Sequence, residues 1–266
     1  MKYRAALLSS VLAGLTLVNA AAAHADSLPD IQKRGTLRVA VPQDFPPFGS
    51  VDTDMSVKGL DIDVAALIAK SLGVKLELIP VTSANRIAYL QTHKADLAIS
   101  TLGKSAEREK VIDFSQAYSP FNNAVYGGAS LKVTGPADLA GQTIGVARST
   151  FEDLQLTSTA PATAVIKRYD DNNGMISAYL AGQVQLVGTG DFVANAIAAR
   201  NPPNRPVEKY VLHESGCYVG LNKNEAPLLA KVNGALTAAK KDGALNAIIQ
   251  KWLHVPLPKK MATTYE

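Results

Sequence analysis

The stretch TLRVAV at residues 36–41 and the segment DIDVAALIAKSL at residues 61–72 decide the fold class of this chain. The first stretch is apolar and β-branched and ends at a Pro-rich loop, which is typical of a buried strand. In the second segment Ile62, Ala65 and Ala69 recur at helical spacing, and Gly73 follows as a helix-ending signal. The two segments therefore predict a strand followed by a helix.

The same alternation continues along the chain. We expect further strands at residues 74–79, 96–101, 142–147, 165–169, 184–189 and 218–221. We expect further helices at residues 84–93, 150–156, 173–181, 191–200 and, broken at Asp242-Gly243, 226–252. Asn172 or Asn173 is the expected N-cap of the helix at 173–181. This order predicts an α/β protein with mainly parallel sheets flanked by helices, and a change of character near residues 122–128 predicts two lobes.

The first 25 residues have the pattern of a removable secretory signal. Lys2 and Arg4 precede an apolar stretch at residues 5–23, and Ala23-His24-Ala25 matches a small-residue cleavage site. We therefore expect cleavage after Ala25 and export to the periplasm. A membrane anchor is the alternative, because the apolar span is almost long enough to cross a bilayer.

Composition and charge exclude several classes of protein. The chain has 266 residues, 47% of them hydrophobic and 19% charged, which is typical of a globular protein and not of a disordered or polytopic membrane protein. Removal of Lys2 and Arg4 lowers the 27 basic residues to 25, against 23 acidic ones. The resulting charge of +2 gives no electrostatic footprint for nucleic acid, so we expect no nucleic-acid partner.

The single cysteine, Cys217, excludes an intramolecular disulfide, and we expect a buried thiol there. A nucleophilic role would need a nearby base, for which His213 is only a weak indication. No C-x-x-C or H-x-x-x-H spacing occurs in the sequence. We therefore expect neither a metal site nor a cofactor.

Polar and aromatic residues gather where the predicted strands end, which is where α/β sheets bind ligands. The loop after the first strand carries Asp44 and Phe45, and the strand at 96–101 leads through Thr101 and Gly103 to Arg108. The planar guanidinium of Arg108 can clamp a carboxylate, although a mixed charge run is also typical of a solvated face.

Two more junctions follow in the second series of strands and helices. Arg148, Ser149 and Thr150 precede a predicted helix, whose free N–H groups and dipole favour an anion. Asp191 begins another predicted helix, where it either caps the helix or pairs with a ligand ammonium.

Four motifs resemble those of the family-3 extracellular solute-binding proteins, the periplasmic polar amino-acid receptors of ABC importers. They are GTLRVA at 35–40, DFPPF at 44–48, GLDIDVA at 59–65 and EREKVIDFS at 107–115. The resemblance implies the two-lobed periplasmic-binding-protein fold of type II, with the ligand in the cleft between lobes. We expect lobe 1 at residues 26–122 plus 219–266 and lobe 2 at residues 123–218.

The resemblance also implies roles for single residues. Arg108 would bind the ligand α-carboxylate and Asp191 the α-ammonium, while Phe45 would stack on the ligand. Ser149 and Thr150 would add hydrogen-bond donors at the start of a helix in lobe 2.

Two candidates depart from the pattern of the family. Leu60 stands where many relatives have an aromatic residue, and Gly103 stands where many have Ser or Thr. Thr101 is the expected substitute for the missing hydroxyl, together with Ser100. Arg148 indicates either an acidic or amide side chain on the ligand, or a side chain that points to solvent.

The expected function is therefore that of a receptor and not of an enzyme. It would bind a small amino acid or related amino-carboxylate as a monomer and deliver it to the membrane permease of an ABC transporter. Two alternatives stay open. A secreted cyclohexadienyl or arogenate dehydratase is similar and has a glutamate where Glu152 stands, although its Asn-Pro-Gly-Gly run is absent here. A transport-independent ligand sensor would use the same closure of the lobes.

Overall fold

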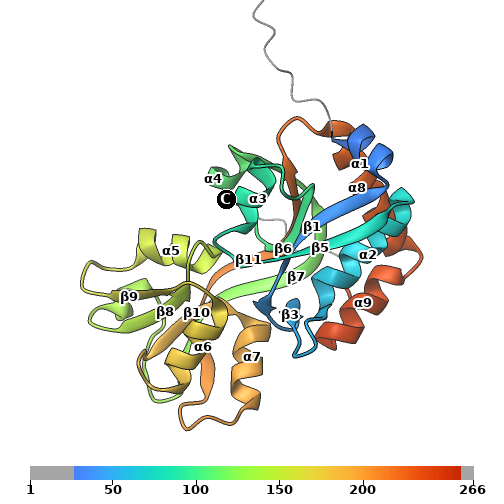
Figure 1. Cartoon of the computed structure of the whole chain (residues 1–266). Helices are drawn as coiled ribbons and strands as arrows, with labels where there is room; N and C mark the ends of the chain where they lie inside the picture. Colours follow the sequence, from blue (N-terminus) through green and yellow to red (C-terminus); the bar gives the residue numbers. More distant parts are fainter. Residues whose placement is uncertain (1–26, 259–266) are drawn as a thin grey trace, which may run out of the picture.

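The computed structural model describes residues 27–258, which form one large sheet and one small sheet with helices around them (Figure 1). The strands of the large sheet are β1 (Thr36–Pro42), β5 (Lys75–Val81), β6 (Leu97–Leu102), β7 (Ile112–Gly128), β8 (Thr143–Ala147), β9 (Val165–Tyr169), β10 (Leu186–Gly190) and β11 (Pro206–Asn222). The small sheet consists of β2 (Asp44–Phe45), β3 (Gly49–Val51) and β4 (Val57–Lys58).

The large sheet has two parallel ends joined by two long antiparallel strands. Its order is β5-β1-β6-β11-β7-β10-β8-β9. β1 pairs parallel with β5 and β6, and β8 pairs parallel with β9 and β10. β7 and β11 pair antiparallel with each other, and their outer neighbours β10 and β6 are antiparallel to them as well. The predicted α/β class is confirmed, and the crossing strands make the sheet mixed.

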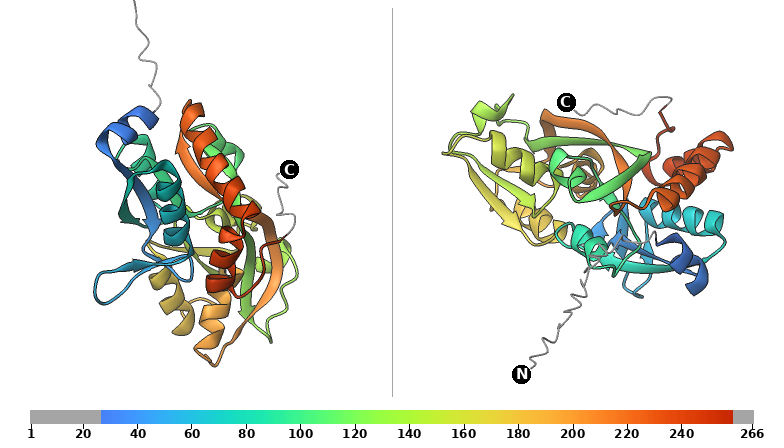
Figure 2. Two further views of the ribbon diagram at one scale, coloured as in Figure 1. Left: turned by 90° about the vertical axis from the view of Figure 1, so that its right-hand side faces the viewer. Right: turned by 90° about the horizontal axis from the view of Figure 1, so that it is seen from above.

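Helices flank both ends of this sheet. The first group is α1 (Leu28–Arg34), α2 (Leu60–Leu72), α3 (Arg86–Gln91), α4 (Ala106–Glu109), α8 (Ala226–Lys241) and α9 (Ala244–Leu253). The second group is the 3-10 helix η1 (Pro136–Leu139) with α5 (Phe151–Thr159), α6 (Asn172–Leu180) and α7 (Asp191–Ala199). Figure 1 and the right-hand view of Figure 2 show the two groups on opposite sides of the crossing strands, with α8 and α9 packed beside α2.

α2 shows how the local sequence builds the first group. Gly73 ends this helix with a φ of 70°, a left-handed conformation that glycine adopts without steric cost. Leu60, Val64 and Ile68 are fully buried and belong to the main core cluster, which also contains the buried residues of α8 and α9. Burial of each such side chain stabilises the fold by roughly 1.5–3 kcal/mol relative to its exposure.

The crossing strands differ most from the expectations. β7 and β11 are 17 residues long, whereas the sequence predicted a strand only at 218–221. Their pairing contains several register shifts, and Pro120 and Asn122 lie in the middle of β7. Such interruptions remove the strict alternation that identifies a strand from sequence. Only the long-range pairing of the two segments makes them strands.

The helix caps also differ in one place. The N-cap of α6 is Asp171, whose carboxylate accepts a hydrogen bond from the Gly174 N–H at 2.7 Å, so the prediction of Asn172 or Asn173 is wrong. Asp171 has an extended backbone that suits a cap, while Asn172 is already helical and buried. The short helix α1 was not predicted.

No helix within residues 27–258 combines the length and apolar character needed to cross a bilayer. In that same part of the chain, no three His, Cys, Asp or Glu side chains are grouped so that they could hold a metal ion. The expected signal sequence and its cleavage site lie outside the described residues.

Candidate functional site

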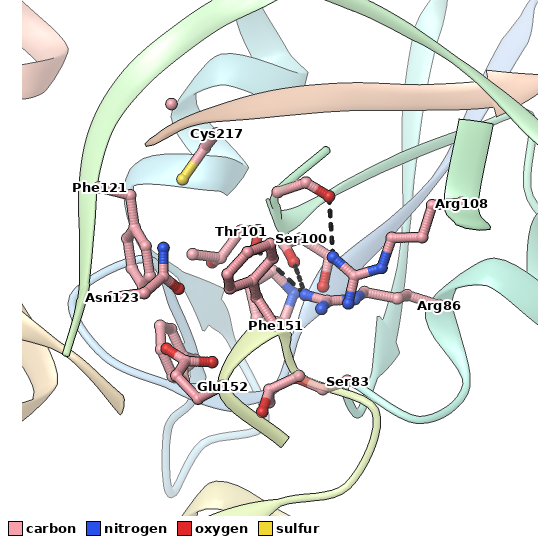
Figure 3. Close-up of a pocket in the computed structure, with 15 residues that line it drawn as sticks. Ser83, Arg86, Ser100, Thr101, Arg108, Phe121, Asn123, Phe151, Glu152 and Cys217 are labelled. Carbon is pink, nitrogen blue, oxygen red and sulfur yellow. Dashed lines mark hydrogen bonds between the residues drawn. The ribbon is translucent and has the colours of Figure 1, made fainter. Parts of the chain in front are cut away.

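A narrow cavity lies where the two groups of elements meet, and Figure 3 shows its walls. Its lining residues are Pro42, Phe45, Ser83, Arg86, Ser100, Thr101, Gly103, Arg108, Phe121, Asn123, Thr150, Phe151, Glu152, Gly216 and Cys217. They come from the ends of β1 and β6, from β2, α3, α4 and α5, and from both crossing strands. The free volume is about 20 Å³, which is room for about one water molecule.

Five predicted site residues line this cavity: Phe45, Thr101, Gly103, Arg108 and Thr150. The first and the last of them lie more than 100 residues apart in sequence. The fold brings the five together because each lies at, or a few residues after, the carboxyl end of β1, β6 or β8. This is the edge at which parallel α/β sheets bind ligands.

The other five predicted residues do not line the cavity. Leu60 is fully buried in the core, and Arg148 is exposed and forms an ion pair with Asp170 at 2.9 Å. Asp44 is buried and accepts a hydrogen bond from the Asn172 N–H at 2.5 Å. Ser149 contributes its backbone carbonyl, as described below. Asp191 is the first residue of α7 and lines a separate groove with Phe192 and Glu214.

Arg108 connects the two groups of elements. Its side chain is buried, with one guanidinium nitrogen donating to the Gly103 carbonyl at 2.8 Å and another to the Ser149 carbonyl at 2.9 Å. Gly103 follows β6 in the first group, and Ser149 precedes α5 in the second. The local turn also holds the backbone of Arg108, because the Ser105 hydroxyl caps α4 by accepting a hydrogen bond from the Arg108 N–H. The guanidinium is thereby fixed at the junction.

Thr101 adopts an unusual backbone conformation that Asp61 holds in place. Its φ is 48°, which is uncommon for a β-branched residue. The Asp61 carboxylate accepts from the Thr101 N–H at 2.7 Å, from its hydroxyl at 3.0 Å and from the Tyr118 hydroxyl at 2.8 Å. Burial, the largest effect, raises the pKa of Asp61 to about 7. Asp61 therefore acts as a positioning residue behind the cavity wall.

Thr150 is the N-cap of α5. Its hydroxyl accepts from the Asp153 N–H at 3.2 Å and donates to the Ala147 carbonyl at 2.9 Å. The hydroxyl is thus used within its own turn. The start of α5 also faces the cavity, and the backbone N–H groups and the dipole of a helix favour negative charge at its start.

Aromatic rings form the apolar part of the wall. The ring centroids of Phe45 and Phe121 lie 6.1 Å apart, and Phe48 contacts Phe121 edge-on at 5.4 Å. On another part of the wall, the Phe151 ring stacks on His213 at 5.0 Å. The rings supply apolar surface beside the charged groups, as is usual in small-molecule sites.

Several lining residues were missed or undervalued in the sequence. Arg86 lies inside a predicted helix and not at a strand end, so nothing local distinguishes it from a solvated arginine. Glu152 was considered only for the dehydratase alternative; its side chain is buried, and burial raises the pKa of its carboxyl above the usual value. Cys217 is the expected buried thiol, and burial raises its pKa well above the usual value, which makes it a poor nucleophile.

A two-part α/β fold that encloses a cavity of arginine, hydroxyl and aromatic side chains at its junction defines a solute-binding protein of the periplasmic type. The model of the bacterial extracellular solute-binding proteins, family 3, matches residues 37–255, and the chain belongs to this family. The resemblance carried by the four sequence motifs is thereby confirmed.

Known relatives span nearly the whole chain. The L-cystine-binding protein TcyJ of Escherichia coli (strain K12) is 29% identical over 236 residues, which cover 87% of this chain and 88% of that protein. The L-arginine-binding protein of Pseudomonas aeruginosa is 26% identical over 250 residues, 90% of this chain and 95% of that protein. A crystal structure of the ancestral amino acid-binding protein AncCDT-1, a precursor of cyclohexadienyl dehydratase, has a TM-score of 0.77 at 30% identity and covers 86% and 99% of the two chains.

Proposed function

We propose that this protein is a periplasmic receptor that captures a small amino acid or related amino-carboxylate and delivers it to the permease of an ABC importer. Family membership and the named amino-acid-binding relatives support this function. The main structural support for this function is the position of Arg108, which is buried and lines the cavity. A buried guanidinium fork at the junction of the two groups can bind a carboxylate with two parallel hydrogen bonds.

The receptor works by closing two lobes on the ligand. We assign residues 26–122 with 219–266 to lobe 1 and residues 123–218 to lobe 2, with β7 and β11 as the connections; of these, residues 26 and 259–266 lie outside the described residues. The hydrogen bond from Arg108 to the Ser149 carbonyl supports this mechanism, because it joins the two sides of the cavity. The free volume of about 20 Å³ is too small for an amino acid, so the ligand must enter an open form.

The first test combines a ligand screen with substitution of Arg108. A thermal-shift screen of the L-amino acids and L-cystine identifies a ligand, since 100 times its dissociation constant stabilises the fold by roughly 2.7 kcal/mol. We then expect Arg108→Ala to lose about 3–5 kcal/mol of binding free energy in calorimetry, or roughly two to four decades in Kd. Arg108→Lys should recover part of the loss.

The matched control is Arg200→Gln, at an exposed position after α7. Its affinity should equal that of the wild type. An Arg108→Ala protein that is folded and binds within about threefold of the wild type, a difference of about 0.65 kcal/mol, contradicts the assignment of Arg108.

Export through a cleaved signal is part of the proposal. Ala23-His24-Ala25 motivates it, and the family description as extracellular proteins supports it. Mass spectrometry of protein from the periplasmic fraction should show Asp26 as the first residue. Recovery of the intact chain from the membrane fraction would instead support an anchored form.

One observation favours a dehydratase as the second candidate. Glu152 is buried in the cavity wall with a raised pKa, and a general acid near neutral pH needs such a carboxyl. The likeness to a dehydratase precursor adds to this. Incubation with prephenate or arogenate decides the matter: turnover that disappears in Glu152→Gln supports the enzyme, and no turnover leaves the receptor.

A further inference from the structure

Arg86 is a buried charge that the rest of the described chain does not neutralise. Its side chain is 4% exposed and lines the cavity. One terminal nitrogen donates to the carbonyls of Ser100 and Thr101, while the buried Nε has no hydrogen-bond partner within residues 27–258. Among those residues, no carboxylate oxygen lies within 4 Å of the guanidinium. A buried charge without a contacting opposite charge is costly, so the site is suited to an anion that comes from outside.

The same strand end holds both cavity arginines. Arg86 donates to the carbonyls of Ser100 and Thr101, and Arg108 donates to that of Gly103, two residues further along the chain. In the view of Figure 3 the two guanidinium groups lie on one side of the cavity, and Phe121, Asn123 and Glu152 lie on the other. Two cations are therefore held by neighbouring residues of one strand end and line the same cavity.

The acids near Arg86 do not balance these cations. Asp61 is occupied by three hydrogen bonds from Thr101 and Tyr118, and its raised pKa favours the neutral form. Among the lining residues, Glu152 carries the one carboxyl group, and burial favours its neutral form too, although the fields of Arg86 and Arg108 oppose this. With both arginines charged, the lining carries a net positive charge even when Glu152 is ionised.

We propose that Arg86 is a second anion-binding residue and that the ligand is an amino dicarboxylate, with one carboxylate on Arg108, the other on Arg86 and the ammonium on Glu152. This inference rests on the proposed receptor function and specifies the ligand class of the same site. Two arginines contribute +2, the amino dicarboxylate contributes −1 and an ionised Glu152 contributes −1, so the closed cavity is neutral. A ligand with a cationic side chain would leave two uncompensated positive charges, and Arg86 therefore excludes it.

The test measures selectivity on the full mature chain. Calorimetry with L-glutamate, L-aspartate, L-glutamine and L-arginine should show that one of the two acidic amino acids binds at least 100-fold more tightly than L-glutamine and L-arginine. Arg86→Gln should weaken binding of that acidic amino acid at least 30-fold, and should weaken binding of L-glutamine by a smaller factor, so that the preference for the acidic amino acid falls. Arg200→Gln is the matched control and should change neither affinity.

Two results would overturn the inference, and they are distinguishable from failure of the receptor function. A wild-type protein that binds L-arginine or L-glutamine more tightly than both acidic amino acids keeps the receptor function and overturns the role of Arg86. The wild-type measurement decides this even where Arg86→Gln does not fold. A wild-type protein that binds no amino acid in the thermal-shift screen overturns the receptor function, and the inference with it.

Discussion

At the scale of single residues, Asp61 links the stability of the fold to the shape of the cavity. It holds Thr101 in a conformation with positive φ, and the carbonyl of Thr101 in turn accepts a hydrogen bond from Arg86. Asp61 thus supports the strand end at which both cavity arginines are held. Because Asp61 is buried, the stability of the fold should depend on pH.

We expect the stability contributed by Asp61 to fall as pH rises from about 4 to about 7. The folded state keeps the proton up to a pKa of about 7, while the unfolded chain releases it near the ordinary value of about 3.9. Between these values the folded state binds more protons, so a rise in pH favours unfolding, by at most about 4 kcal/mol in total. Above pH 7 the effect is constant.

Urea unfolding of the wild type and Asp61→Asn across pH 4–8 checks this prediction. The difference in unfolding free energy between the two proteins should change steadily over pH 4–7 and then level off. Parallel pH profiles would show that Asp61 is ionised in the folded protein at all these values.

At the scale of elements, the end of β10 controls the position of an aromatic ring in the cavity wall. A Cβ atom added at Gly190 would lie 2.2 Å from Cζ of Phe121. Phe121 packs against Phe45 and Phe48, so its ring has little room to move except into the cavity. A glycine is therefore required where β10 meets the crossing strand β7.

We expect Gly190→Ala to destabilise the fold by about 1–3 kcal/mol, the usual cost of overpacking, and to weaken ligand binding. Gly234→Ala in α8 is the matched control, because a Cβ there meets no atom within 4 Å. Alanine loses less conformational entropy than glycine when the helix forms, which should stabilise that variant by about 0.5–1 kcal/mol. Urea unfolding measures both changes, and equal stabilities for the two variants would contradict the close packing.

At the scale of the whole molecule, we expect the two crossing strands to be the hinge of the protein. β7 and β11 connect the two groups of elements (Figure 1). The cavity is lined by residues of both groups. Motion about such connections is hinge closure, in which a few residues absorb the change while each lobe stays rigid.

We expect the radius of gyration to decrease when a saturating ligand closes the lobes. Small-angle scattering of the mature chain, with and without the amino acid identified in the thermal-shift screen, measures this change. The same curves give the mass, for which we expect a monomer. Identical curves for the empty and the verified ligand-bound protein would contradict the closing mechanism.

The local sequence was sufficient for the repeated strand–helix units and for part of the site. The helix α2 and the strand β5 follow from periodicity, because side chains three to four or two residues apart share one face. Phe45, Thr101 and Arg108 could be predicted to share one cavity because they lie at or after strand ends, and the topology of parallel sheets places such ends together.

The tertiary structure alone decided the rest. β7 and β11 become strands through pairing between residues that are 78 to 110 positions apart, from Gly128 with Pro206 to Ile112 with Asn222, which local periodicity does not encode. Arg86 and Glu152 line the cavity while Asp191 lies in another groove, because burial depends on how distant elements pack against one another. A charged residue on a helix has the same local pattern whether it faces water or a ligand, and only packing distinguishes the two.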